Sequence, residues 1–189
     1  MHSDTTTIVD MRMETDYKIV HNVFTVQELT DIVTMFKRFD PNHTNDDDFV
    51  ATDYGVSLNH FGLPWFKKKV YQRIKETLEW SDYAEIIFAA FIDVTLPNHN
   101  KHLDSYHFYN RNLPGKPYKV CMIPYSVDNN IHAINKASTY VYDQDGERHE
   151  LIWKIGTAFH WSSDVTAHHS SEMVDYDSKQ YLLVQTYLP

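Results

Sequence analysis

The sequence predicts a mainly β fold in which two helices precede most of the strands. Between residues 17 and 80, apolar side chains recur at helical spacing. From residue 85 onward, short runs of β-branched and aromatic residues alternate with turn residues. The chain is rich in tyrosine (13), phenylalanine (10) and tryptophan (4), which favours a packed, strand-rich core. Such a series of short strands predicts an antiparallel sandwich or barrel.

The N-terminal third predicts a lead-in, a strand and a helix. Residues 1–16 show no clear apolar pattern, and we expect a loose lead-in there. Residues 17–24 are predicted to form a strand. Thr25 and Glu28 then match a capping box, with Thr25 as the N-cap and Glu28 reaching back. The apolar stripe behind this box predicts one amphipathic helix that ends near Arg38.

A second helix and a series of strands are expected further along the chain. Residues 41–48 predict a polar, acidic loop. Pro64 suits the first turn of a helix, which we expect to end near Trp80. The strands are predicted at residues 85–96, 119–126, 138–142, 150–154, 157–161 and 180–188. No linker divides the chain, so residues 1–189 are expected to form a single domain.

Composition excludes some classes of function and of location. The formal net charge of −9 argues against a general nucleic-acid binder, which normally has a basic surface. Cys121 is the single cysteine, so an internal disulfide is impossible and a reducing compartment is indicated. It lies in an apolar run, which favours a buried thiol over a nucleophile. We find no membrane-spanning run and no secretory signal, and we expect a cytoplasmic protein.

A candidate metal site is indicated by His102 and Asp104, then His168 and His169, then Lys179. Two imidazoles and one carboxylate can occupy one face of a ferrous ion and leave its other positions open. A lysine further along the chain can hold the far end of an anionic co-substrate that chelates the metal.

The His-x-Asp tripeptide is weak evidence by itself, because short motifs recur by chance. A second copy, His2-Ser-Asp4, lies in the lead-in. His102 and Asp104 instead follow a long predicted strand and a turn-rich segment. Side chains two residues apart on an extended segment point to the same side, so both can face one metal.

Structural explanations remain for each of these residues. His102 and Asp104 can form a solvated turn, and His168 and His169 can lie in a polar surface loop. Lys179 can begin an edge strand, where lysine discourages aggregation. Three other histidines do not keep the ordered spacing and are expected at the surface or behind the ligands: His99, His107 and His160.

At this point the chain resembles the iron(II)- and 2-oxoglutarate-dependent oxygenases, particularly their prolyl-4-hydroxylase-like branch. The resemblance covers roughly residues 17–188 and rests on the order of several short motifs. These motifs are YKIVHNVFTVQELTDIV, HLD, YKVCMIPYS, ELIWKIGTAFHW and HHSSEMVDYDSK. The family implies a double-stranded β-helix, a jelly-roll barrel of the cupin type, with helices flanking it at the N-terminal side.

The resemblance also implies roles for individual residues. Iron(II) would be held by His102, Asp104 and one of the two adjacent histidines. We prefer His169, because its spacing of ten residues to Lys179 is the commonest in this branch, and keep His168 as the alternative. Lys179 would pair with the distal carboxylate of the co-substrate 2-oxoglutarate. Tyr125 is a candidate hydrogen-bond partner of the same carboxylate.

Two positions depart from the family pattern in the region that the resemblance assigns to co-substrate binding. The strand that carries Tyr125 usually leads into a glycine-rich turn, but residues 127–136 contain no glycine. Two positions beyond the usual basic residue, a serine or threonine is frequent, but here the residue is Tyr181.

The implied activity is hydroxylation of an unactivated C–H bond with dioxygen, on a peptide, an amino acid or a small metabolite. One alternative is a cupin-like metal protein that does not use 2-oxoglutarate and does not need Lys179. Another is a catalytically silent jelly-roll that serves as an interaction or structural module. A nucleobase demethylase is disfavoured by the negative charge. The sequence does not define the substrate or the oligomeric state.

Overall fold

The structure is a computed structural model that describes most of the predicted strands and the first helix. It describes residues 17–37, 49–52, 55–58, 70–80, 85–94, 118–143, 145–162, 167–170 and 176–187. The expected lead-in (1–16), the acidic loop (41–48) and the start of the second helix at Pro64 lie outside these residues.

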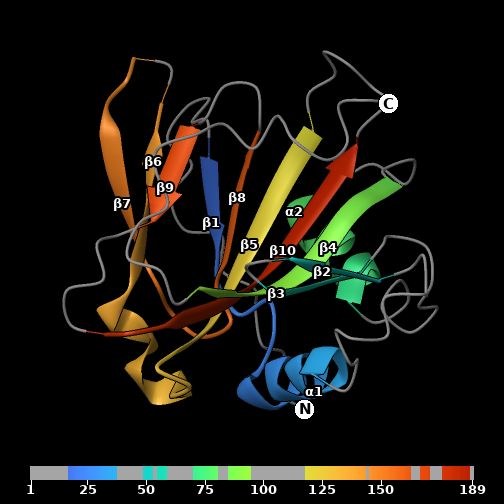
Figure 1. Cartoon of the computed structure of the whole chain (residues 1–189). Helices are drawn as coiled ribbons and strands as arrows, with labels where there is room; N and C mark the ends of the chain where they lie inside the picture. The colour runs from blue at the N-terminus through green and yellow to red at the C-terminus, as the bar shows by residue number, and fades with distance from the viewer. Residues whose placement is uncertain are drawn as a thin grey trace, which may run out of the picture.

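The described strands form two antiparallel sheets, which confirms the mainly β prediction (Figure 1). The elements are β1 (Tyr17–Val20), α1 (Val26–Lys37), β2 (Phe49–Thr52), β3 (Gly55–Leu58), α2 (Gln72–Leu78), β4 (Glu85–Val94), β5 (Tyr118–Val127), η2 (Ile131–Lys136), β6 (Ser138–Tyr142), β7 (Arg148–Ile152), β8 (Ala158–Ser162), β9 (Ala167–Ser170) and β10 (Lys179–Tyr187). The larger sheet has the order β1-β8-β5-β10-β4-β3-β2, and the smaller has the order β7-β6-β9. Among the described strands the sheets stay separate and do not close into one barrel.

Among the described side chains, each face of the larger sheet carries a hydrophobic cluster. The helix-side cluster joins α1 and α2 to the sheet through residues such as Leu29, Ile74 and Leu182. The inter-sheet cluster fills the space between the two sheets and includes Val141 of β6 and Tyr181 of β10. Because side chains alternate along a strand, neighbouring residues of β5 and β10 enter different clusters. Membership of a cluster therefore assigns a residue of these strands to a face.

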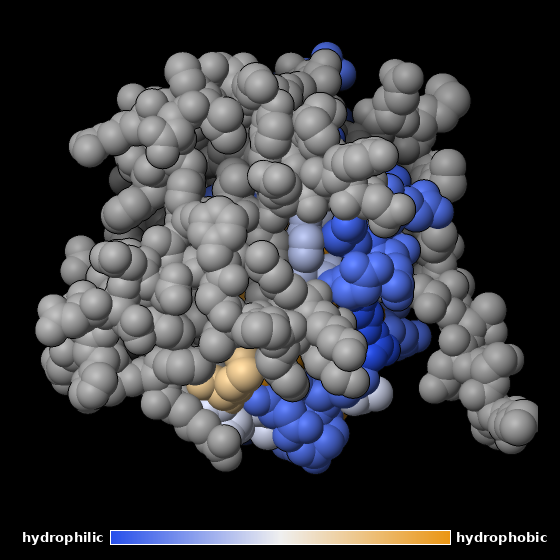
Figure 2. Space-filling view, turned by 90° about the vertical axis from the view of Figure 1, so that its right-hand side faces the viewer, coloured by the Kyte–Doolittle hydropathy of each residue, from blue (hydrophilic) through white to orange (hydrophobic). Residues whose placement is uncertain are grey.

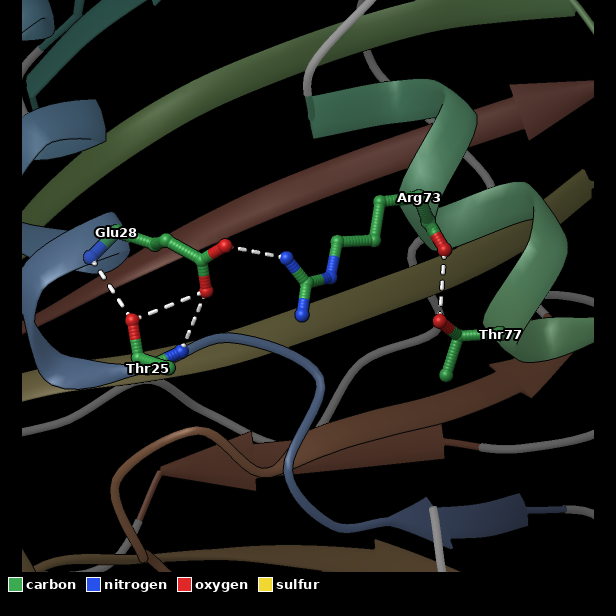
Figure 3. A network of polar contacts seen from close by, with 4 residues as sticks. All are labelled: Thr25, Glu28, Arg73 and Thr77. Carbon is green, nitrogen blue, oxygen red and sulfur yellow. Dashed lines mark hydrogen bonds and ion pairs between the residues drawn. The ribbon is translucent and has the colours of Figure 1, made fainter. Parts of the chain in front are cut away.

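The N-terminal end of α1 is fixed by a polar network that also reaches α2 (Figure 3). The predicted capping box is confirmed: the Thr25 amide donates to Glu28 Oε2 at 2.8 Å, and the Glu28 amide donates to Thr25 Oγ1 at 3.2 Å. Arg73 of α2 donates to the other oxygen of Glu28. Burial acts to raise the pKa of Glu28, but the hydrogen bonds from Thr25 and the charge of Arg73 outweigh it, so the pKa is lowered.

The segment before α1 packs against a tight turn that leads into β8. The Val23 amide donates to the Gly156 carbonyl at 2.8 Å. Gly156 has φ +71°, and a Cβ placed there would lie 2.4 Å from the carbonyl oxygen of Phe24. Only glycine fits both the backbone conformation and this close approach. This turn therefore fixes how α1 is set against the sheet.

The described surface offers little apolar area. On the side shown in Figure 2 the described residues are mostly hydrophilic, with one small apolar patch. Val26 and Ile152 are the large hydrophobic residues that the described part of the chain exposes. No helix within that part is long and apolar enough to cross a membrane.

Candidate metal and co-substrate site

Lys179 is the predicted site residue that the structure describes most fully. It opens β10, as expected, but its side chain is only 1% exposed. Within the described part of the chain its Nζ atom has no hydrogen-bond partner, and it lies 5.3 Å from the centre of the Trp153 ring. Burial lowers the pKa of Lys179 to about 7. An ammonium group buried without a counter-charge is unfavourable by several kcal/mol, on the order expected for a desolvated ion.

The surroundings of Lys179 are aromatic and ordered. Trp153 is fully buried, and its Nε1 donates to Thr139 Oγ1 at 3.0 Å. Tyr181 packs edge-on against Trp153, with 5.8 Å between the ring centres. Thr139 Oγ1 also lies 3.4 Å from Met122 Sδ. These contacts fix the ring beneath the ammonium group, and they supply no carboxylate. A small anion with a buried carboxylate would complete this arrangement, so the residues fit one end of 2-oxoglutarate.

In the larger sheet Lys179 lies between the last residues of β4 and β5. Lys179 pairs with Val94 on one side and with Val127 on the other. Val94 is the last residue of β4 and stands eight positions before His102 in the sequence. His102 and Asp104 themselves lie outside the described residues, and their role as iron ligands stays a prediction.

The backbone of β9 places His168 and His169 at different register positions. His168 pairs with Val141 of β6, and His169 pairs with Tyr140. Val141 is fully buried in the inter-sheet cluster, whereas Tyr140 is half-buried and lies outside that cluster. Directly paired residues of antiparallel strands share a face of the sheet. The position of His168 is therefore on the face toward the larger sheet, and the position of His169 is on the opposite face.

Tyr125 lies away from the Lys179 ammonium group. It packs against the helix-side cluster, and its ring meets that of Phe91 edge-on at 6.0 Å. The ring beneath Lys179 belongs to Trp153, which is part of the inter-sheet cluster. Tyr125 and the Lys179 ammonium group thus lie on opposite faces of the larger sheet. A contact between Tyr125 and the co-substrate stays a prediction without support from this packing.

The structure also brings together three potential ligands that the sequence analysis did not select. Single ligand atoms of Asp143, Glu147 and His149 lie within 4.8 Å of one another. Asp143 accepts from the Glu147 amide at 2.8 Å and bonds to His149 Nε2 at 2.7 Å. The His149 bond, followed by that amide, lowers the pKa of Asp143 against the effect of burial. These bonds close the β6–β7 hairpin, and exposed acidic groups of this kind are common without a metal.

His160 is buried, which corrects the expectation of a surface position; the alternative position behind a metal ligand stays a prediction. Its side chain is 8% exposed, and Nε2 accepts a hydrogen bond of 2.7 Å from Trp80 Nε1. Burial, helped by the charges of Lys119 and Lys18, lowers the pKa of His160 to about 3. The neutral ring thus connects the segment after α2 to β8.

Comparison with solved structures identifies the fold. The structure of a Pseudomonas putida prolyl-4-hydroxylase matches with a TM-score of 0.57 and 8% identity, covering 93% of this chain and 94% of that chain. A viral collagen prolyl hydroxylase from Paramecium Bursaria Chlorella virus-1 matches with a TM-score of 0.56 and 8% identity, covering 92% and 97%. The 2-oxoglutarate-dependent epimerase SnoN matches with a TM-score of 0.62 and 10% identity, covering 92% and 78%.

The chain therefore has the jelly-roll fold of the 2-oxoglutarate- and iron(II)-dependent oxygenases, and it resembles the prolyl hydroxylases among them. The predicted resemblance is confirmed for the fold. No family model and no curated protein matches the sequence. Since these structures are 8–12% identical to the chain, they do not identify its substrate.

Proposed function

We propose that the protein is an Fe(II)- and 2-oxoglutarate-dependent dioxygenase that hydroxylates an unactivated C–H bond. The observation that carries this proposal is the Lys179 ammonium group, which is buried and has no hydrogen-bond partner among the described residues, in a fold shared with such oxygenases. The dicarboxylate 2-oxoglutarate can pair one carboxylate with Lys179 and keep its 2-oxo acid end for the metal. The chemistry supplied there is dioxygen activation coupled to decarboxylation of 2-oxoglutarate to succinate.

The iron ligands proposed are His102, Asp104 and one histidine of β9. The spacing to Lys179 favours His169, but the strand register favours His168, whose partner Val141 belongs to the inter-sheet cluster. We give more weight to the register, because a slip of one residue moves a side chain to the other face of a sheet. Trp153 and Tyr181 exclude water around Lys179 and so strengthen its attraction for a carboxylate.

Anaerobic titration with Fe(II) and 2-oxoglutarate tests this proposal directly. The wild-type complex is expected to show a weak visible charge-transfer band between metal and 2-oxo acid. Asp104→Ala should abolish the band, and Lys179→Ala should weaken 2-oxoglutarate binding while iron binding is retained. An unchanged band in Asp104→Ala would remove the proposed ligand set.

A paired substitution of the two adjacent histidines decides between them. His168→Ala should abolish iron binding, and His169→Ala should preserve it within a few-fold. The opposite result would assign the ligand to His169 and show that the register argument fails for β9. Metal content after dialysis, measured by plasma emission, gives the answer without any substrate.

The substrate proposed is a peptide, an amino acid or a small metabolite. A structurally similar prolyl hydroxylase from Trichoplax adhaerens was solved in complex with a peptide fragment, which supports testing peptides first. Succinate release together with a mass gain of one oxygen would demonstrate hydroxylation. Iron binding without any effect of 2-oxoglutarate would support a cupin-like metal protein instead. Binding of neither would support a catalytically silent module.

A further inference from the structure

We propose that Asp128, in the turn after β5, is a positioning residue for Lys179 at the start of β10. The inference rests on the proposed function, because it assigns Lys179 to the co-substrate. Asp128 itself touches neither metal nor co-substrate in this assignment. It acts through the backbone of the two residues that precede Lys179.

The carboxylate of Asp128 holds the backbone just before β10. Its Oδ1 atom accepts from the Asp177 amide at 2.8 Å and from the Ser178 amide at 2.9 Å. The Asp128 amide in turn donates to the Ser178 carbonyl at 3.0 Å. Three hydrogen bonds therefore continue the pairing of β5 with β10 beyond the last ladder pair, Lys179 with Val127.

The ladder between β5 and β10 shifts register between Gln180 and Tyr181, so on the β5 side only two ladder pairs, at Lys179 and Gln180, precede the shift. A bulge leaves one residue unpaired and increases the local twist. The side chain of Gln180 compensates on this side of the shift. Its Oε1 accepts from Ser126 Oγ at 2.7 Å, and its Nε2 donates to Asn129 Oδ1 at 3.0 Å. Lys179 is thus held between the Gln180 contacts on one side and the Asp128 contacts on the other.

The backbone conformation of the turn supports a specific role for its side chains. Asp128 has φ 51° and Asn129 has φ 57°. Two successive positive φ values are typical of a two-residue hairpin turn and favour glycine or asparagine. Most other residues are disfavoured there by about 1 kcal/mol or more. Both residues carry side chains that glycine would lack: Asp128 bonds to Ser178, just before β10, and Asn129 bonds to Gln180 in β10.

Two substitutions at Asp128 separate the contribution of its side-chain acceptor oxygen from that of its backbone conformation. Asp128→Asn keeps an acceptor oxygen and tolerates positive φ. Asp128→Gly removes the acceptor but relieves the backbone strain, so the protein should fold. Asn22→Gly is the matched control, since Asn22 has φ 59° in the connection between β1 and α1.

The first readout is the pKa of Lys179, measured in the metal-free protein by NMR of ¹³C-labelled lysine. In Asp128→Gly the pKa should rise toward the ordinary lysine value of about 10.4, because a loosened β10 start admits water to the ammonium group. Asp128→Asn and Asn22→Gly should both keep the wild-type value. The identity of the Lys179 signal follows from its loss in Lys179→Met.

The second readout is the affinity for 2-oxoglutarate in the Fe(II)-loaded, anaerobic protein. Asp128→Gly should bind about five- to tenfold more weakly, the change expected when roughly 1 kcal/mol of hydrogen bonding is lost. Asp128→Asn should restore most of the affinity, and Asn22→Gly should leave it unchanged.

An unchanged Lys179 pKa and an unchanged affinity in Asp128→Gly would overturn the proposal and leave Asp128 as an ordinary turn residue. Failure of the wild-type protein to bind 2-oxoglutarate would instead refute the proposed function. The metal-free pKa comparison would still show whether Asp128 positions Lys179, so the two failures are distinguishable.

Discussion

Lys179 carries its charge inside the protein, where no described side chain neutralises it. The pKa of about 7 means that the group is half-protonated near neutral pH. A bound carboxylate favours the charged form and raises this pKa. Binding of an anion and uptake of a proton are therefore linked at this residue.

This linkage predicts how 2-oxoglutarate affinity depends on pH. The affinity should be highest near and below pH 7 and should fall by up to about tenfold per pH unit above it, because neutral Lys179 must first take up a proton. Calorimetry from pH 7 to 9, in buffers of different ionisation enthalpy, would measure both the affinity and the proton uptake. Lys179→Arg stays charged throughout and should flatten the dependence. A pH-independent wild-type affinity would contradict the assignment of Lys179.

The same residue predicts opposite effects on stability and on binding. Lys179→Met should raise the free energy of unfolding near pH 7 and abolish 2-oxoglutarate binding. In the wild-type protein the unfolded chain binds the Lys179 proton up to about pH 10.4, while the folded chain releases it near pH 7. Wild-type stability should therefore rise with pH across this window, by up to about 1.4 kcal/mol per unit relative to Lys179→Met.

Urea unfolding at pH 7, 8 and 9 measures this difference. Lys154→Met, at an exposed lysine, provides the control and should leave the pH dependence unchanged. Equal slopes for wild type and Lys179→Met would show that the buried lysine titrates normally.

The site was predictable from sequence only in part, and individual residues show why. The expectation that Lys179 opens the last strand is confirmed, because the strand pattern behind it is strong. Its contact with Trp153 joins positions 26 residues apart, which no local pattern encodes. Spacing along the chain favours His169, whereas the pairing of β9 with β6 favours His168, and the choice between them stays a prediction.

At the scale of elements, local signals predicted the strong elements and missed the short ones. The capping box set the start of α1, and β-branched runs set β5, β6 and β8. β2 and β3 escaped detection because their four-residue sequences gain order by pairing with each other and with β4. The turn at Asp128 and Asn129 lacks the Asn-Gly or Asp-Gly signal that normally marks such hairpins.

The turn before β8 gives a prediction at this scale. Gly156→Ala should lower the free energy of unfolding by about 2–4 kcal/mol, because its Cβ would clash with the Phe24 carbonyl and its φ of +71° is strained for alanine. Gly146→Ala is the matched control. Gly146 has φ +79°, but a Cβ there meets nothing within 4 Å.

Gly146→Ala should therefore lower the free energy of unfolding by only about 1 kcal/mol, the effect of placing alanine at a positive φ. Chemical denaturation of both variants measures the difference. Equal losses would show that the contact between the Gly156 turn and the start of α1 is unimportant.

For the whole molecule, acid stability should depend on His160. The folded protein holds this ring neutral down to about pH 3, whereas an unfolded histidine is protonated below about pH 6.5. The stability contributed by the neutral ring is complete above pH 6.5 and is lost as pH falls from 6.5 toward 3, by up to about 1.4 kcal/mol per unit.

His160→Gln keeps an acceptor for Trp80 but does not titrate. Compared with its own stability at pH 7, this variant should lose less stability than the wild type as the pH falls. Its acid unfolding should therefore occur at a lower pH, which tryptophan fluorescence would follow. His132→Gln, on the surface in η2, is the control. Identical acid transitions in His160→Gln and wild type would show that another group controls acid unfolding.

The position of β10 has a consequence for how the protein is made. β10 lies at the centre of the larger sheet, between β4 and β5, yet it is the last described strand to leave the ribosome. Until then β4 and β5 lack the neighbour that joins them, and the nascent chain exposes two unfinished sheet edges that invite aggregation. Because Lys179 belongs to the same strand, the chain gains its anchor for an anion in the step that completes its larger sheet.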